Sequence, residues 1–460
     1  MRGARQSISS NLAPFSRAYA TLAVVRLPAS PFVRCCAGVS AAALAAWGAA
    51  CVSLDDLTSG GAFAPSDAGD DIAPRGDADV PDLDAGTDGE SGGPIVDGSV
   101  PLASNTALSL ATADSHTCTV LGNGQLACWG DNASGQIGFG DQRPRPRPAY
   151  AVPTPLAVSK VWTGGATTCV QYADTSAECW GAGDKGQLGY GDLVMRTYAS
   201  GQLLFTRVTQ MAVGTDHVCA ETANGLACWG ANDHGQLGYG DTMARITAAT
   251  ASGVALTFTS NLVAGPQATC VNDGNSAVRC WGGFGFGRLG TGSASGDALA
   301  PAAVQNGTDE VAKPLAMGAS HGCYIVKGGS LRCSGSNVSG ELGVATPAQS
   351  AVPAAQVAGL SAVMELAVGL HHTCARTTTT IYCWGANDVG QLGVATPAQS
   401  TTPISIAVPG TPSRIAAGPN HTCALNTVGA VYCWGANAGG QLGDGTTFPR
   451  SVPTLVRFGP

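Results

Sequence analysis

The chain has 460 residues, of which 44% are hydrophobic and only 12% are charged, and its formal net charge at pH 7 is −8. Residues 1–51 carry five Arg and no acid, residues 52–104 carry 12 acids and one Arg, and the remaining 17 basic and 19 acidic side chains nearly balance. A nucleic-acid-binding domain needs a clustered basic face, so this balance argues against nucleic acid as a partner.

Residues 1–51 have the features of an export leader. The five arginines precede an Ala-rich apolar run over residues 36–50, which is too short to span a bilayer as a stable helix. Small residues then lead to Cys51, although Gly48 stands where a bacterial lipoprotein signal usually has Leu. This segment is similar to such a signal, which predicts that Cys51 is lipidated. An ordinary secretory peptide cleaved nearby is the alternative.

Residues 52–104 have the composition of a disordered segment. Gly, Pro and Ser separate the 12 acidic side chains, and Phe63 is the only aromatic residue. Such a chain cannot bury enough apolar surface to offset its ordering entropy, and like charges along it repel. We expect an acidic tether that holds a folded head away from a membrane.

From residue 105 to the end the sequence consists of seven copies of one unit. The last copy reads HTCALNTVGAVYCWGANAGGQLG from His421, and the first cysteines of successive copies lie 49 to 53 residues apart. The copies begin at His116, Thr167, His217, Ala268, His321, His372 and His421. A period near 50 residues is typical of propeller blades, which bury their faces against one another. Residues 105–460 are therefore predicted to form an all-β, seven-bladed β-propeller.

Each unit is predicted to contain a hairpin followed by a conserved turn. Short strands flank a turn that contains Gly or Asn, as in Asn123-Gly124 and Asn224-Gly225. A Gly-x-Leu/Ile-Gly turn follows in every copy, and its aliphatic residue is expected to pack between blades. A Trp follows the second cysteine in six copies, but Ser334 replaces it in the fifth, which we expect to be the most loosely packed blade. For closure of the ring, we expect residues 452–457 to share a blade with the strand around residues 107–111.

The combination of HTCAL, VYCWG and GQLG resembles the repeat of the regulator of chromosome condensation family, whose members are seven-bladed propellers. The resemblance covers about residues 105–460. A cysteine pair in every unit departs from the intracellular members and indicates an exported, Cys-rich bacterial variant.

The cysteines themselves predict seven disulfides. Cys35, Cys36 and Cys51 belong to the leader, so 14 of the 17 cysteines remain, two in each unit. Each pair flanks a tight turn, where opposed residues of an antiparallel pair are close enough for a disulfide bond. The expected bonds are Cys118–Cys128, Cys169–Cys179, Cys219–Cys228, Cys270–Cys280, Cys323–Cys333, Cys374–Cys383 and Cys423–Cys433. Buried free thiols in a cytosolic propeller are the alternative.

Three other motifs contain residues that could bind a metal, a nucleotide or a partner. His-x-Cys could supply zinc ligands, but Thr167 and Ala268 replace the histidine where both cysteines persist, so no metal is expected. The G-x-G-x-x-G of residues 285–290 lies in a repeat turn without a βαβ context, so no nucleotide cofactor is expected. Arg143, Arg145 and Arg147 alternate with prolines and form either a partner-contact patch or, as we favour, a solvated polyproline-like loop.

These observations favour a non-catalytic, monomeric head that binds an unknown protein or glycan at the bacterial cell surface, on the outer membrane or in the periplasm. The only membrane attachment expected is the lipid on Cys51. Guanine nucleotide exchange, which the family resemblance implies, and a propeller lyase or glycosidase are the alternatives.

Overall fold

The computed structural model describes residues 106–150, 154–248, 261–273, 277–305, 311–326, 329–345, 347–353 and 356–459. The predicted leader with Cys51 and the predicted tether lie outside these residues. Within the described part, no helix has the length and apolar character needed to cross a bilayer.

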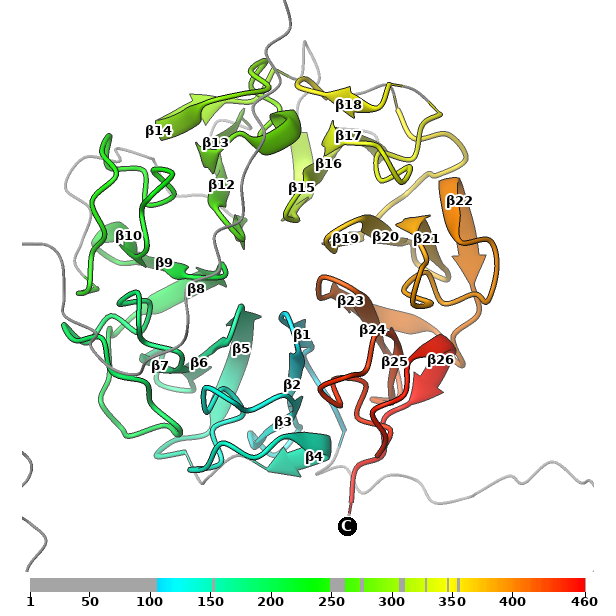
Figure 1. Ribbon diagram of the computed structural model, residues 1–460. Coiled ribbons are helices and arrows are strands. Elements are labelled where there is room, and N and C mark those ends of the chain that lie inside the picture. The colour runs from blue at the N-terminus through cyan, green and yellow to red at the C-terminus, as the bar shows by residue number, and fades with distance from the viewer. Residues whose placement is uncertain are drawn as a thin grey trace, which may run out of the picture. The chain divides into compact units, whose positions relative to one another are not determined.

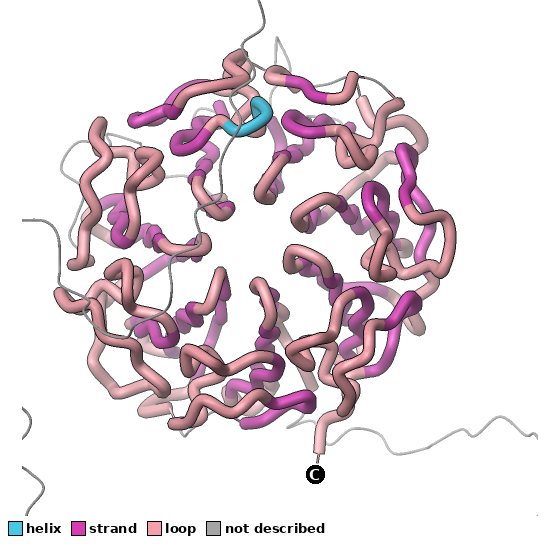
Figure 2. The backbone as a smooth tube through the Cα atoms, in the orientation of Figure 1, coloured by secondary structure: helices cyan, strands magenta, loops and turns pink. Residues whose placement is uncertain are grey.

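The described chain forms seven antiparallel sheets arranged in a ring, as Figures 1 and 2 show. Five sheets have four strands and two have three, and the strands of each sheet follow one another in sequence. Among the described residues the single helical element is the short 3-10 turn η3 (Gly285–Gly287). The all-β, seven-bladed propeller predicted from the sequence is thus confirmed.

The blades are numbered in chain order. Blade 1 contains β1 (Ala111–Thr112), β2 (His116–Val120), β3 (Leu126–Gly130) and β4 (Arg145–Tyr150). Blade 2 contains β5 (Val158–Gly164), β6 (Thr167–Tyr172) and β7 (Ala177–Gly181), and blade 3 contains β8 (Val208–Val213), β9 (His217–Thr222) and β10 (Gly225–Gly230). Blade 4 contains β11 (Leu262–Gly265), β12 (Ala268–Asp273), β13 (Ala277–Gly283) and β14 (Asp297–Ala303). Blade 5 contains β15 (Val311–Met317), β16 (His321–Val326), β17 (Ser330–Ser336) and β18 (Gln349–Ser350). Blade 6 contains β19 (Glu365–Val368), β20 (His372–Arg376), β21 (Ile381–Ala386) and β22 (Gln399–Ile406). Blade 7 contains β23 (Pro412–Ala417), β24 (His421–Asn426), β25 (Val431–Gly435) and β26 (Arg450–Leu455).

Each blade contains one disulfide, and all seven join the cysteines that the sequence pairs. The two cysteines of a blade lie directly opposite each other in the central hairpin, with their Cα atoms 4.1 Å apart. The difference between separations of nine and ten residues is taken up in the hairpin turn. Where the separation is ten, the turn has one more residue, and in blades 1, 5 and 7 it holds a left-handed glycine such as Gly124 (φ 79°). In blade 2 the same place is taken by Thr175 (φ 70°).

The blades are joined by hydrogen bonds to the Gly-x-Leu/Ile-Gly turn. The backbone carbonyl of its second residue accepts a bond from the indole N–H of the Trp in the next blade. These pairs are Trp180 to Gln136 (3.1 Å), Trp229 to Gln187 (2.9 Å), Trp281 to Gln236 (2.9 Å), Trp384 to Glu341 (2.9 Å), Trp434 to Gln391 (3.0 Å) and Trp129 to Gln441 (2.9 Å). In blade 5 the hydroxyl of Ser334 takes the place of the indole and donates to the carbonyl of Arg288 at 3.1 Å. The aliphatic residue of the turn is fully buried, as Leu237 and Leu342 illustrate.

The expected closure of the ring is wrong. β26 is the outer strand of blade 7 and β1 is the inner strand of blade 1, so the chain ends share no blade. Figure 1 shows the two terminal blades side by side. They meet through the same bonds as other neighbours, because the carbonyl of Gln441 accepts from both Trp129 and the hydroxyl of Thr117. The edge of Phe458 also packs on the Trp129 ring, with centroids 6.0 Å apart. A shared blade is unnecessary because every sheet is complete within one repeat.

The buried histidines form a second set of bonds between blades. In each of five seams, His Nε2 lies 2.7 to 3.3 Å from the hydroxyl of a Thr in the next blade. That hydroxyl donates to the same turn carbonyl that the Trp uses, as Thr422 does to Gln391 at 3.0 Å. The histidine must therefore carry its proton on Nε2 and donate it.

Where the histidine is missing, its partner is missing too. Thr167 of blade 2 is followed in blade 3 by Val218, and Ala268 of blade 4 is followed in blade 5 by Gly322. The histidine is thus part of a matched pair across a seam and has no link to the cysteines.

A double-mutant cycle should measure this pairing at the seam between blades 6 and 7. Thr422→Val alone leaves the Nε2–H of His372 buried without an acceptor, which we expect to cost about 1–3 kcal/mol. Adding His372→Thr gives this seam a Thr and a Val, the same two residues that Thr167 and Val218 place at the seam between blades 2 and 3. The two substitutions together should cost less than the sum of the single changes, by about 1 kcal/mol, in chemical denaturation. Additive costs would contradict the pairing.

The five seam histidines should make stability depend on pH. Burial lowers the pKa of His116, His217, His321, His372 and His421 from 6.5 to about 3. Below pH 6.5 the unfolded chain binds protons that the folded chain does not, so the free energy of unfolding should fall as pH falls from 6.5 toward 3. Each histidine contributes up to about 1.4 kcal/mol per pH unit in this window.

The raised pKa values of Asp114, Asp216 and Glu365 act in the opposite direction. The control is the double variant His372→Thr/Thr422→Val, which should show a shallower acid dependence because one histidine is removed. Equal slopes in denaturation experiments between pH 6.5 and 4 would contradict the assignment.

Candidate functional site

The innermost strand of every blade faces a channel on the axis of the ring (Figure 1). A cavity of about 410 Å³ lies among these strands, and Glu365 and Arg414 contribute charges to its lining. A smaller cavity of about 100 Å³ forms the mouth of the channel at one end. The mouth is lined by residues 112–114, 163–165, 213–215, 264–266, 317–319, 368–370 and 417–419, three from each blade.

We call this end of the ring the loop face. It carries the turn between the first two strands of each blade, and the longer loop that contains the Gly-x-Leu/Ile-Gly turn. The opposite end carries the hairpin turns that the disulfides flank. Its loops have nearly the same length in every blade, and the residues at their tips differ between most blades.

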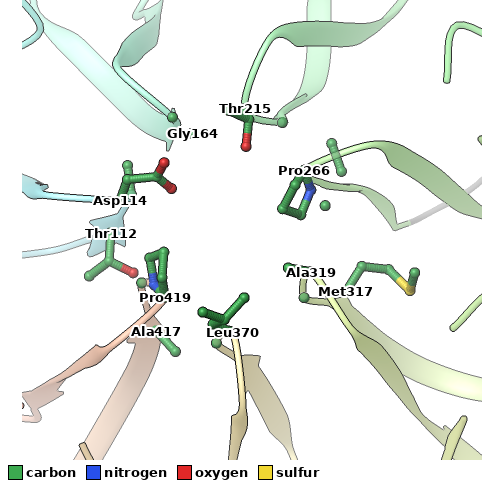
Figure 3. Close-up of a pocket in the computed structure, with 18 of the residues that line it drawn as sticks. Thr112, Asp114, Gly164, Thr215, Pro266, Met317, Ala319, Leu370, Ala417 and Pro419 are labelled. Atoms are coloured by element: carbon green, nitrogen blue, oxygen red, sulfur yellow. The ribbon is translucent and has the colours of Figure 1, made fainter. Parts of the chain in front are cut away.

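The mouth of the channel is polar on one side and apolar on the other. In Figure 3 the carboxylate of Asp114 and the hydroxyl of Thr215 lie on the side of blades 1 and 3. Pro266, Leu370 and Pro419 lie on the side of blades 4, 6 and 7. A ligand at the mouth would therefore meet acidic and hydroxyl groups on one side and an apolar wall on the other.

Aspartates near the mouth repel one another. Desolvation and then repulsion by Asp216 raise the pKa of Asp114. Desolvation and then repulsion by Asp184 raise the pKa of Asp216, while Lys185 partly opposes this rise. The carboxylates of blades 1 to 3 thus form one negatively charged region.

Three consecutive blades carry the same clamp on their outer loop. An aromatic residue, a Gly, an Asp and, four residues after the Asp, an Arg follow the repeat turn directly. In each clamp the guanidinium pairs with the Asp and lies over the aromatic ring. The pairs are Arg145–Asp141 (2.8 Å) over Phe139, Arg196–Asp192 (2.9 Å) over Tyr190, and Arg245–Asp241 (2.8 Å) over Tyr239. Blade 7 keeps only the ion pair, Arg450–Asp444 at 2.7 Å.

The loops of blades 2, 3 and 7, each with this Asp–Arg ion pair, expose large apolar side chains at their tips. Val194 is 59% exposed, and Met243 and Phe448 are each 69% exposed. All three stand two residues before the clamp Arg of their blade. The clamp motif was visible in the sequence as a recurring F/Y-G-D-x-x-x-R. Its role was missed because spacing alone does not show that the Arg folds back onto the ring and the Asp.

A buried carboxylate also holds the outer loop of blade 2, over residues 192–201, in place. Glu178 on β7 is fully buried and accepts bonds from the Tyr172 hydroxyl (2.8 Å), the Ser200 hydroxyl (3.0 Å) and the backbone N–H of Ser200 and of Gly201. A buried carboxylate needs such partners because an unpaired charge would be costly. The loop over residues 192–201 is therefore held at both ends.

The arginines predicted as a possible contact have three different surroundings. Residues 145–150 form β4, so the favoured interpretation as a solvated loop is wrong for Arg145 and Arg147. Outer edge strands tolerate proline because its missing N–H faces away from the ladder. Arg145 is engaged in the blade 1 clamp, Arg147 is exposed beside Gly445 of blade 7, and Arg143 is exposed at the rim.

The remaining motifs have structural roles. The His-x-Cys cysteines are bonded to each other, and within the described residues no cluster of His, Cys, Asp and Glu has the arrangement of a metal site. The G-x-G-x-x-G of residues 285–290 lies in the turn between β13 and β14, around η3. There Arg288 donates to the carbonyl of Gly283 in its own blade and of Ala319 in the next.

Comparison with known proteins agrees with this repeat structure. Models of the Regulator of chromosome condensation (RCC1) repeat match residues 380–425, 428–460 and 413–441. Residues 380–460 therefore contain RCC1 repeats. A stretch of 284 residues is 29% identical to the ultraviolet-B receptor UVR8 of Arabidopsis thaliana, over 59% of this chain and 63% of the receptor. The match thus spans less than two thirds of that relative.

Solved structures of other proteins share the fold. Human WBSCR16 is similar with a TM-score of 0.64 and 20% identity, over 73% of this chain and 95% of that one. Prp20p of Saccharomyces cerevisiae is similar with a TM-score of 0.65 and 20% identity, over 76% of this chain and 87% of that one. At this identity the likeness concerns the fold.

Proposed function

We propose that this RCC1-repeat propeller is a non-catalytic binding platform whose loop face engages a protein or glycan partner. The observation that carries the proposal is the division of roles among residues. The recurring Trp, Thr, His and turn carbonyls join the blades, whereas the clamped loops present exposed apolar side chains such as Val194 and Met243. Rigid loops on a stable scaffold are a common form of binding site.

The fold relatives support a role in binding. The structure of Prp20p is described together with that protein's binding properties to Gsp1p and histones. A partner of the present chain would be different, because the seven disulfides indicate an oxidising, exported environment. We propose that the head acts as a monomer at the bacterial cell surface or in the periplasm, with Arg143 and Arg147 at the rim available to the partner.

Site-specific photo-crosslinking on the full-length exported protein tests the binding face. A photoreactive phenylalanine analogue at Val194 or Met243 should give a discrete cross-linked product with a protein partner in intact cells. The matched control is Val428, which is 65% exposed on the opposite end of the ring. Products from position 428 alone would contradict the proposal. Retention on a glycan array that is lost in Val194→Asp would identify a glycan partner at the same face.

The anchor is a separate proposal that rests on residues outside the described part. We propose that the mature protein begins at Cys51 and carries acyl chains, with residues 52–104 as the spacer to the head. Two or more acyl chains give stable anchoring, whereas a single chain is marginal. Labelled palmitate should be incorporated into the natural protein and absent from Cys51→Ala, with Cys36→Ala as the control that retains label. Incorporation that persists in Cys51→Ala would contradict lipidation.

A further inference from the structure

Large apolar side chains are exposed on the outer loops of two neighbouring blades, 2 and 3, on the loop face. Leu193, Val194 and Met243 are 57%, 59% and 69% exposed, and Met195 lies beside them. Gln142 of blade 1 reaches across and donates to the Met195 sulfur at 3.5 Å. Clustered apolar exposure on a soluble domain is typical of an interaction site.

The backbone beneath these side chains is held by polar anchors. The clamps of Asp192 with Arg196 and of Asp241 with Arg245 fix the loops just beyond their tips. In blade 2 the buried Glu178 accepts four bonds from the far end of the loop, from Ser200 and Gly201. The apolar tips are therefore presented in one conformation before any partner arrives, which lowers the entropy lost on binding.

Carboxylates lie toward the channel from these tips on the same face. Asp114 and Asp216 stand in the inner turns of blades 1 and 3, and Asp131, Asp184 and Asp233 stand in the loops just after the hairpins. The nearby basic side chains are Lys185, which pairs with Asp184 at 3.6 Å, and Arg143 at the outer rim. The clamp arginines are neutralised by their own aspartates. This sector of the loop face therefore has an excess of negative charge.

The other blades do not repeat this combination. At the position of Asp233, blade 4 has Gly285, blade 5 has Val338 and blade 7 has Ala438. Blade 6 has Asp388, but the inner turn of that blade carries His371 instead of an acid. The acidic and apolar features thus coincide only over blades 1 to 3.

We propose that this sector binds a cationic segment of a partner protein. Lys or Arg side chains of the segment would lie over Asp114 at the channel mouth and over the nearby Asp216, and adjacent apolar side chains would lie on Val194 and Met243. Complementary charge is what selects a cationic occupant over a neutral apolar one. The inference rests on the proposed binding function and names the chemistry of the partner.

Peptide selection on the full-length protein tests the proposal. A random dodecapeptide library displayed on phage is selected against the immobilised chain, and the enriched sequences are synthesised and measured by calorimetry. We expect enrichment of Lys or Arg next to large apolar residues. In Asp114→Asn/Asp216→Asn, affinity for these peptides should fall about tenfold at low salt, and this difference should shrink at high salt because the interaction is screened.

Two further variants separate the contributions. Val194→Ser/Met243→Ser should also weaken binding about tenfold, but with little dependence on salt. The control Asp388→Asn removes an exposed carboxylate from the turn of blade 6 that corresponds to that of Asp233 and should leave affinity unchanged. Thermal melting should show that each variant stays folded, and Asp114→Asn/Asp216→Asn should melt no lower than the natural protein because it removes two desolvated carboxylates that repel each other.

These outcomes separate the inference of a cationic partner from the proposed binding function on which it rests. Selected peptides without basic residues, or peptides that bind Asp114→Asn/Asp216→Asn as well as the natural chain, overturn the cationic partner. If those same peptides still compete with photo-crosslinking at Val194, the proposed function stands. Failure of both peptide selection and photo-crosslinking overturns both.

Discussion

The structure depends on one recurring contact, the backbone carbonyl in the Gly-x-Leu/Ile-Gly turn that accepts bonds from the next blade. In most seams it receives the indole N–H of a Trp, and in five it also receives a Thr hydroxyl whose oxygen is bonded by a buried His. A carbonyl has two lone pairs, so both donors can be satisfied at a buried interface. The last turn bonds the first blade in the same way, through Gln441, and this closes the ring without exchange of strands.

The disulfides act within blades and the seams act between them. Each Cys–Cys bond crosses a hairpin of about ten residues, so it stabilises one sheet and does not determine how sheets meet. By the chain-entropy estimate each bond contributes roughly 2–3 kcal/mol. The polar seams also make the protein less stable in acid. Burial in a seam keeps each histidine neutral and lowers its pKa, whereas the unfolded chain can bind the proton.

We assign the proposed binding function to the parts of the repeat that do not build the ring. The loops of blades 1 to 3 share clamps of Asp, Arg and an aromatic ring, and differ in the residues at their tips. This arrangement allows side chains such as Val194 or Met243 to change without loss of loop conformation. The channel mouth adds Asp114 and Thr215 to the same face.

The sequence by itself determined the number of blades, the hairpin in each and the pairing of 14 cysteines, because these are local features that recur in every repeat. The seam bonds between residues about 40 to 50 positions apart, such as Trp434 with Gln391, became visible only in the tertiary structure. So did the match between Thr167 and Val218, since it requires knowing which strand of one blade faces which strand of the next. Closure was mispredicted for the same reason: no local pattern reveals whether the terminal strands share a sheet or pack as separate blades. The candidate binding sector likewise depends on the ring, because only its curvature brings the inner turns of blades 1 and 3 and the outer loops of blades 2 and 3 onto one face.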